Sequence, residues 1–194
     1  MKEYLENSEY IDWQDTELQS EAKFLSKGLE TDTDIAKSCF EYMRDNIKHS
    51  FDYELNPVTV KASDVLRHGT GYCYAKSHLL AALLRANDIP AALCYQRLTI
   101  DNDQPPFCLH GLNAVYLKNY GWYRVDARGN KPGVEAEFCP PREQLAFPLL
   151  SEGEADVPGL HAKPLAAVTE VLEKYDTYLD VVENLPDDAS FESI

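Results

Sequence analysis

Three residues in the middle of the chain have the types and the order that cysteine-based acyl chemistry requires. Cys73 directly precedes a long apolar helix pattern, and His110 and Asp126 follow in two strand-like segments. A thiol nucleophile, a histidine base and a carboxylate that orients the base form such a set. The order therefore predicts attack by Cys73, proton transfer by His110 and orientation of the imidazole by Asp126.

The predicted position of Cys73 at the start of a helix favours the thiolate form of its side chain. The N-terminus of a helix carries partial positive charge and unpaired N–H groups, and a neighbouring imidazolium stabilises a thiolate further. The N–H of Cys73 also suits the role of donor to the oxyanion of a tetrahedral intermediate. Such a site needs a second donor, for which Tyr53 in the preceding segment 49–56 is the candidate.

The faces of the two predicted strands decide whether His110 and Asp126 can meet, because side chains alternate between faces along a strand. A plain four-residue loop would pair Leu117 with Trp122 and turn Asp126 to the wrong face. A three-residue loop would pair Leu117 with Gly121 and bring Asp126 diagonal to His110, within side-chain reach. The triad hypothesis therefore predicts an odd-length loop or a bulge in this turn.

Hydrophobic periodicity supplies the elements that must hold these residues. Helices are predicted over about 17–28, 33–48, 73–86 and 164–183, and strands over about 90–100, 108–117 and 122–127. Caps for the first two helices are expected at Asp15 or Thr16 and at Thr31 or Thr33. The helix after Cys73 is apolar on more than one face, which predicts that it is buried in the middle of the fold.

The polar, proline-ended segment 101–107 predicts a loop, and its place before His110 suggests a lid over the site. Gly69 and Gly71 allow unusual backbone geometry just before Cys73. Helices come first and antiparallel strands follow, and this segregation predicts the α+β class. The length of 194 residues suits a core domain over 1–160, with its N-terminal helices, and a C-terminal helical arm over 161–194.

Composition excludes several classes of protein. The charge balance of 18 basic and 33 acidic residues gives 18 − 33 = −15, the wrong sign for binding nucleic acid or an anionic membrane surface. No segment approaches the ~20 apolar residues of a membrane span. The N-terminus lacks an apolar signal core, which predicts a cytoplasmic protein. Five cysteines without close spacing are then expected to be free thiols.

Three segments resemble the transglutaminase-like superfamily. They are Ala62–Leu66 continuing through Gly71-Tyr72-Cys73 to Ala91, the histidine strand His110-Gly111-Leu112-Asn113-Ala114-Val115-Tyr116, and the aspartate strand Gly121-Trp122-Tyr123-Arg124-Val125-Asp126. The resemblance covers about residues 33–130. It implies a papain-like α+β fold, with a nucleophile helix packed on an antiparallel sheet. It also implies Cys73 as nucleophile, His110 as general base and Asp126 as orienter.

One departure from the family pattern concerns the residues after His110. Ala followed by Trp is frequent there in the family, whereas this chain has Gly111-Leu112, a difference that bears on substrate contacts more than on the triad. The family includes cross-linking acyltransferases, amidases and cysteine proteases. The resemblance implies neither calcium dependence nor another cofactor for this chain.

The predicted function is that of a thiol hydrolase or acyltransferase acting on an amide or ester through an acyl-enzyme, with hydrolysis preferred. The substrate would be a peptide, a protein or a small amide, and the oligomeric state is not predicted. The alternative is a catalytically silent transglutaminase-like module that binds a protein. Cys108 is read as a thiol of the site wall; a zinc site with Cys73 and His110 is disfavoured because short-spaced ligand pairs are lacking.

Overall fold

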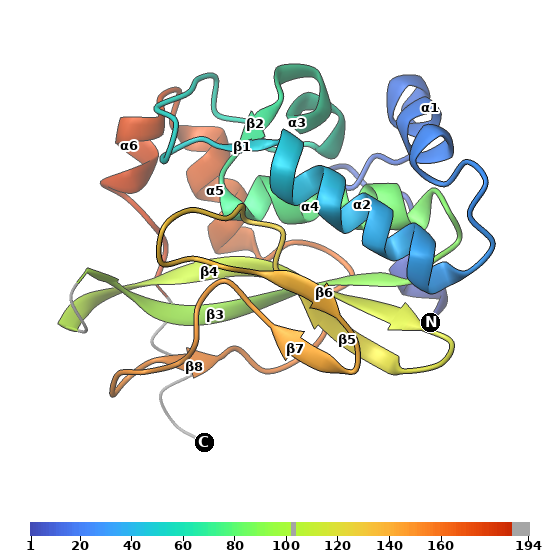
Figure 1. Cartoon of the computed structure of the whole chain (residues 1–194). Coiled ribbons are helices and arrows are strands. Elements are labelled where there is room, and N and C mark those ends of the chain that lie inside the picture. The colour runs from blue at the N-terminus through green and yellow to red at the C-terminus, as the bar shows by residue number, and fades with distance from the viewer. Residues whose placement is uncertain (102–103, 188–194) are drawn as a thin grey trace.

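The protein is described here by a computed structural model that covers residues 1–101 and 104–187. An antiparallel sheet in the order β5-β4-β3-β8 forms its centre. The strands are β3 (Ala91–Asp101), β4 (Gln104–Leu117), β5 (Gly121–Val125) and β8 (Ala155–Asp156). Four helices lie on one face of this sheet (Figure 1): α1 (Thr16–Leu25), α2 (Asp32–Asn46), α3 (Ala62–His68) and α4 (Cys73–Arg85). The predicted α+β class is confirmed.

Short elements complete the fold around this frame. They are the 3₁₀ turn η1 (Lys2–Leu5), the parallel pair β1 (Lys48–His49) and β2 (Thr70–Gly71), the hairpin β6 (Glu137–Cys139) and β7 (Arg142–Gln144), and the helices α5 (Ala166–Lys174) and α6 (Tyr178–Val182). Figure 1 shows α5 and α6 beside the N-terminal end of α4. The predicted single helix 164–183 is therefore two helices. Tyr175 is extended, and the Thr177 side chain caps α6 by accepting from the Asp180 N–H.

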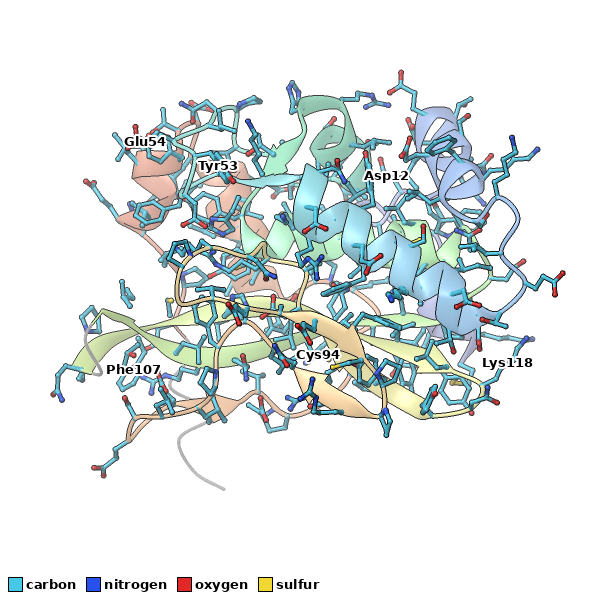
Figure 2. All side chains as sticks on the ribbon, viewed as in Figure 1. Asp12, Tyr53, Glu54, Cys94, Phe107 and Lys118 are labelled. Carbon is cyan, nitrogen blue, oxygen red and sulfur yellow. The ribbon has the colours of Figure 1, made fainter. Side chains whose placement is uncertain are left out.

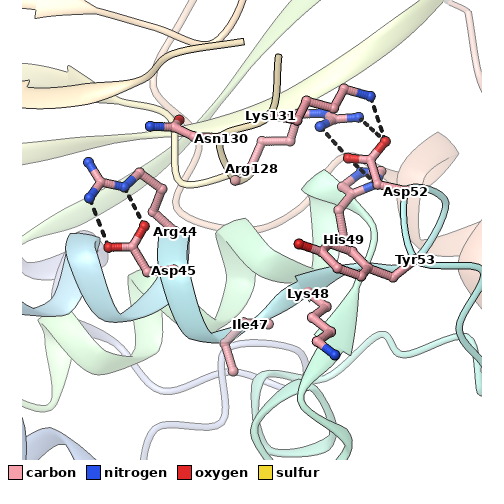
Figure 3. Close-up of a pocket in the computed structure, with 11 residues that line it drawn as sticks. Arg44, Asp45, Ile47, Lys48, His49, Asp52, Tyr53, Arg128, Asn130 and Lys131 are labelled. Atoms are coloured by element: carbon pink, nitrogen blue, oxygen red, sulfur yellow. Dashed lines mark hydrogen bonds and ion pairs between the residues drawn. The ribbon is translucent and has the colours of Figure 1, made fainter.

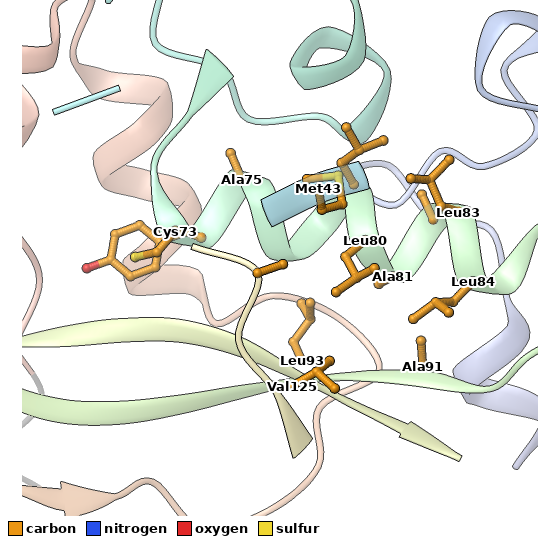
Figure 4. Packing of buried hydrophobic residues seen from close by; sticks show 14 of the residues in the cluster. Met43, Cys73, Ala75, Leu80, Ala81, Leu83, Leu84, Ala91, Leu93 and Val125 are labelled. Atoms are coloured by element: carbon orange, nitrogen blue, oxygen red, sulfur yellow. The ribbon is translucent and has the colours of Figure 1, made fainter. Parts of the chain in front are cut away.

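The helix α4 is buried along its whole length, as its apolar pattern predicts. Leu80, Leu83 and Leu84 are at most 1% exposed. Figure 4 shows them between Met43 of α2 on one side and the sheet residues Leu93 and Val125 on the other. Truncating a fully buried leucine to alanine in such a core costs about 2–5 kcal/mol. The core thus fixes the axis of the helix that begins at Cys73.

Local signals set the helix ends. The Asp15 carboxylate accepts from two backbone N–H groups at the start of α1, and the Thr31 hydroxyl accepts from the Asp34 N–H at the start of α2, as predicted. The first helix ends at Leu25 instead of about residue 28, and Gly28 with φ +78° lies in the turn that follows. At the end of α3, Gly69 has φ +65° and closes the helix in the left-handed conformation.

The prediction of a loop over 101–107 is wrong for most of the segment, because its described residues belong to strands β3 and β4. β3 runs to Asp101 and β4 begins at Gln104, and these two residues pair in a hairpin; residues 102–103, part of the supposed lid, lie outside the described residues. Within the described chain, β5 pairs only with Asn113–Leu117 of β4. The N-terminal half of β4 is therefore an edge. The register shift between Thr99 and Asp101 also leaves Pro105 and Pro106 without paired residues on β3, so no ladder needs their missing N–H groups.

None of the helices in the described part of the chain combines the length and the apolar character that crossing a membrane requires.

Candidate active site

Cys73 is the first residue of α4, so its backbone N–H has no acceptor within the helix. The approach to it is tight. A Cβ on Gly71 would lie 3.0 Å from the Thr59 Oγ1 and 3.2 Å from the Ala75 Cβ, so a larger residue here would have to displace these side chains. The Cys73 residue is 8% exposed. The preceding Tyr72 donates its hydroxyl hydrogen to the Tyr178 carbonyl of α6 at 2.5 Å.

His110 and Asp126 meet across the sheet. Leu117 pairs with Gly121, so the turn between β4 and β5 holds three residues, and Asn113 pairs with Val125. The odd-length loop predicted from strand faces is confirmed. The Nε2 atom of His110 lies 2.7 Å from the Asp126 Oδ2, and both side chains are buried.

Both charges of this pair are stabilised by their surroundings. Burial by itself lowers the pKa of His110, but the Asp126 carboxylate and the Cys73 sulfur outweigh burial and raise that pKa to about 10. Burial likewise opposes ionisation of Asp126, yet the His110 imidazolium and the N–H groups of Arg128 and Ala146 hold the pKa of Asp126 below its usual value. Because Nε2 is engaged by Asp126, Nδ1 is the ring nitrogen left for Cys73, whose sulfur helps to raise the pKa of His110.

The strand that carries His110 also contacts Cys73 through its backbone. The Gly111 N–H donates to the Cys73 Sγ at 3.5 Å. A Cβ on Gly111 would lie 3.0 Å from the Tyr74 Cα, so a side chain here would push α4 away from the sheet. The Tyr74 hydroxyl donates to the Leu109 carbonyl, and the Asn113 amide donates to the Ser77 carbonyl at 2.9 Å. These contacts fix Cys73 against His110.

Further contacts around the triad come from the loop-rich region after β5, where the sequence gave no local signal. The Asp126 Oδ1 accepts from the Arg128 N–H at 3.1 Å, and the Oδ2 accepts from the Ala146 N–H at 3.2 Å. The Phe147 ring packs edge-on against the His110 ring with centroids 5.1 Å apart. These residues orient the pair and limit its solvation. They are distant along the chain, so only the fold brings them together.

Tyr53, the predicted second oxyanion donor, lies in an exposed loop after β1 (Figure 2) and is 56% exposed. The Lys48 ammonium lies over its ring, 5.2 Å from the centroid. Within the described residues, no hydrogen bond joins Tyr53 to Cys73 or His110. The structure thus brings three of the four predicted residues together and leaves the fourth apart, so the role of Tyr53 stays a prediction.

Tyr53 instead borders a cavity of about 320 Å³ between the end of α2, the segment after β1 and residues 128–131. Figure 3 shows the Asp52 carboxylate at its wall, held by Arg128 at 2.6 Å and by Lys131 at 2.6 Å. His49 also lines the cavity, and its ring meets the Tyr72 ring with centroids 5.4 Å apart. Burial, followed by the charge of Arg128, holds the pKa of His49 well below its usual value. A neutral imidazole therefore lies between this cavity and the nucleophile end of α4.

The other cysteines differ from Cys73 in their surroundings. Burial raises the pKa of Cys39, Cys94 and Cys108 to about 12 in each case, so these thiols are protonated at neutral pH. Cys139 is half-buried in the β6–β7 hairpin, where its thiol donates to the Arg142 carbonyl. Across residues 1–101 and 104–187, no three His, Cys, Asp or Glu side chains gather as metal ligands would.

The chain was compared with known proteins. The sequence model of the transglutaminase-like superfamily matches residues 20–127, more than half of the chain and a range that contains Cys73, His110 and Asp126. No match was found among curated proteins.

Two solved structures resemble this one. A "putative cysteine protease" from Cytophaga hutchinsonii is 22% identical, with a TM-score of 0.51 over 64% of this chain and 40% of its own. A "putative protease" from Parabacteroides distasonis is 14% identical, with a TM-score of 0.43 over 72% of this chain and 30% of its own. This chain therefore spans less than half the length of either protein, and the first likeness supports the fold.

Proposed function

This chain belongs to the transglutaminase-like superfamily, and from that membership we propose that it is a thiol hydrolase that cleaves an amide or ester bond through an acyl-enzyme. The observation that carries the proposal is the position of the His110 ring. Its Nε2 lies 2.7 Å from the Asp126 Oδ2, and its other nitrogen is left for Cys73, whose sulfur also helps to raise the pKa of His110. A buried, charge-stabilised imidazole between a carboxylate and a thiol is what an activated cysteine requires.

The proposed reaction has two halves. The Cys73 thiolate attacks the carbonyl carbon and forms a C–S bond, while the N–H of Cys73 donates to the developing oxyanion. The His110 imidazolium then protonates the leaving amine or alcohol, and the C–N or C–O bond breaks to leave a thioester. Water attacks the thioester, neutral His110 takes the water proton, and the C–S bond breaks to release the acid and the thiolate.

Asp126 acts on His110 and not on the substrate. Its Oδ2 accepts from Nε2, which leaves Nδ1 facing the sulfur and stabilises the imidazolium during both halves of the reaction. An amine in place of water would give acyl transfer by the same steps. Hydrolysis is proposed because water is the acceptor that needs no second binding site.

The catalytically silent protein-binding module is the second candidate, favoured by the 8% exposure of Cys73. Iodoacetamide at pH 7 separates the two. In an enzyme, Cys73 should be alkylated at least about tenfold faster than Cys139, because only thiolates react and an unpaired thiol is a few per cent ionised at this pH. Peptide mass mapping measures the rate at each cysteine.

The matched control is the half-buried Cys139, which lies outside the triad. The variant His110→Ala should slow alkylation of Cys73 by roughly 30-fold, the ratio between a full thiolate and a few per cent of it, and leave Cys139 unchanged. A p-nitrophenyl ester should give a burst of one equivalent with the wild type and none with Cys73→Ala. Slow, uniform alkylation without a burst would support the binding module instead.

A further inference from the structure

The edge of β4 that β5 leaves uncovered, beside His110, contacts a segment of the C-terminal region. The Leu109 N–H donates to the Pro186 carbonyl at 2.7 Å. Two residues further on, the Gly111 N–H donates to the Cys73 Sγ at 3.5 Å. Alternate N–H groups of a strand point to the same edge, and two residues span about 7 Å. The Pro186 carbonyl and the nucleophile thus sit on one strand edge, about two residues apart.

A second contact holds this segment by its charge. The Asp187 carboxylate accepts from the Arg97 Nε at 2.6 Å and from its Nη2 at 2.8 Å, a two-pronged pair. Arg97 is 4% exposed and pairs with Leu109 in the β3–β4 register. Its guanidinium lies 3.8 Å from the centroid of the Phe107 ring, at the end of the sheet visible in Figure 2. A buried guanidinium of this kind recognises a carboxylate specifically.

The segment enters the edge past the residue that precedes the nucleophile. The Tyr178 carbonyl accepts from the Tyr72 hydroxyl at 2.5 Å, and the Tyr178 N–H donates to the Asn56 Oδ1 at 2.8 Å. Leu185 packs against the main core cluster. The stretch from Tyr178 to Asp187 therefore offers a backbone carbonyl, an apolar side chain and a carboxylate to the side of the site where Cys73 opens.

We propose that this edge of β4 binds the substrate as an extended peptide, and that residues 184–187 occupy it as an internal competitor. The inference rests on the proposed function and adds a substrate class to it. The preferred peptide has an apolar residue, then a residue whose carbonyl accepts from the Leu109 N–H, then an acidic residue whose carboxylate replaces that of Asp187 on Arg97. Strand addition of this kind takes affinity from the main chain and specificity from side chains.

The carboxylate carries the selectivity. If the peptide carries a neutral amide in place of this carboxylate, neither hydrogen bond to the buried guanidinium has a charged acceptor. Binding of the peptide should then weaken by about 10–100-fold. The internal segment competes at a high effective concentration because it is tethered to the same chain. A peptide added to the wild-type protein must therefore displace it, and loosening the segment should raise the apparent affinity.

The test uses full-length Cys73→Ala protein, which binds without reacting, and a fluorescein-labelled, end-capped peptide Asn-Leu-Pro-Asp followed by anisotropy. The additional change Asp187→Asn, which removes the Asp187 carboxylate from Arg97, should tighten binding by about tenfold or more. Glu183→Gln is the matched control: it removes one acidic charge from the exposed turn after α6, one residue before the competing segment. It should change binding less than twofold. The peptide Asn-Leu-Pro-Asn should bind the loosened variant about tenfold less tightly or worse.

Equal binding of the two peptides, or equal effects of Asp187→Asn and Glu183→Gln, would overturn the inference. The proposed function is tested separately by alkylation of Cys73 and by the ester burst, neither of which requires this peptide. Selective peptide binding without any burst would refute the enzyme and leave a peptide-binding edge. A burst without selective peptide binding would refute the edge and leave the enzyme.

Discussion

Replacing Asp126 with asparagine removes one charge from the triad and leaves its volume almost unchanged. All three partners of the carboxylate are donors: the His110 Nε2 at 2.7 Å, the Arg128 N–H at 3.1 Å and the Ala146 N–H at 3.2 Å. An asparagine amide has one oxygen and one NH₂ group. Whichever way it is placed, the NH₂ group faces at least one buried donor, and an unsatisfied buried donor costs about 1–3 kcal/mol.

The effect on His110 is larger and has a definite sign. The Asp126 carboxylate and Cys73 hold the pKa of His110 above its usual 6.5 against the opposing effect of burial. Without the carboxylate charge, the opposing effect of burial lowers the pKa of His110, and the imidazolium becomes less stable at neutral pH. In the orientation where NH₂ faces Nε2, the ring must also carry its proton on Nδ1 and can no longer accept one there.

The expected result is a loss of reactivity of at least roughly 30-fold at pH 7, because an unpaired thiol is only a few per cent thiolate there. Alkylation of Cys73 followed from pH 5 to 10 should differ most between the wild type and Asp126→Asn at neutral pH, where the Asp126 charge helps to keep His110 protonated. Asp64→Asn, in the first turn of α3, serves as the control for an unrelated carboxylate. Superimposable profiles for wild type and Asp126→Asn would refute the role given to this residue.

Two further substitutions test how the site is held. Gly111→Ala places a Cβ 3.0 Å from the Tyr74 Cα, a backbone atom that cannot rotate away. The free energy of unfolding measured in urea should therefore fall by about 1–3 kcal/mol, and alkylation of Cys73 should slow. Unchanged values would contradict the close contact. Burial lowers the pKa of Lys76 to about 7 from an ordinary 10.5. Between these two pH values the unfolded chain binds this proton and the folded protein does not, so the free energy of unfolding should rise with pH. Lys76→Met should lack that rise when unfolding is compared at pH 6.5 and 9.5, and equal pH dependence in both proteins would refute it.

The nucleophile helix and the register of the two site strands were predictable because their signals are local. The run of apolar residues after Cys73 predicted a buried helix, and the alternation of faces together with the triad hypothesis predicted the pairing of Leu117 with Gly121. Pairing within the β3–β4 hairpin was missed because the polar, proline-containing segment before Phe107 has the composition of a loop. An edge strand accepts that composition, and the sequence does not show which strand is an edge.

The supports of the site were not predictable because they are made between distant segments. Phe147 lies in a loop-rich region, and nothing nearby in the sequence points to His110. Lys76 is a charged residue in a buried helix, where its ammonium donates to the carbonyls of Met43 and Ile47 at the end of α2. The left-handed Gly69 and the crowded Gly71 were predictable as a need for glycine, although not in their exact contacts.

The site combines a rigid part with a part that is held more lightly. Cys73 and His110 are locked together by contacts between α4 and β4, among them the Asn113 amide on the Ser77 carbonyl and the Gly111 N–H on the sulfur. In the described part of the chain, the Leu109–Pro186 backbone hydrogen bond, the Arg97–Asp187 ion pair and the packing of Leu185 tie the C-terminal segment to the same edge, and the Asp187 side chain is one-third exposed. Opening that segment therefore costs far less than separating the triad. If this ordering holds, Asp187→Asn should speed alkylation of Cys73, and the rate should stay nearly constant at urea concentrations below the unfolding transition. A site that opens only by global unfolding would instead show an alkylation rate that rises with urea in step with the unfolding equilibrium.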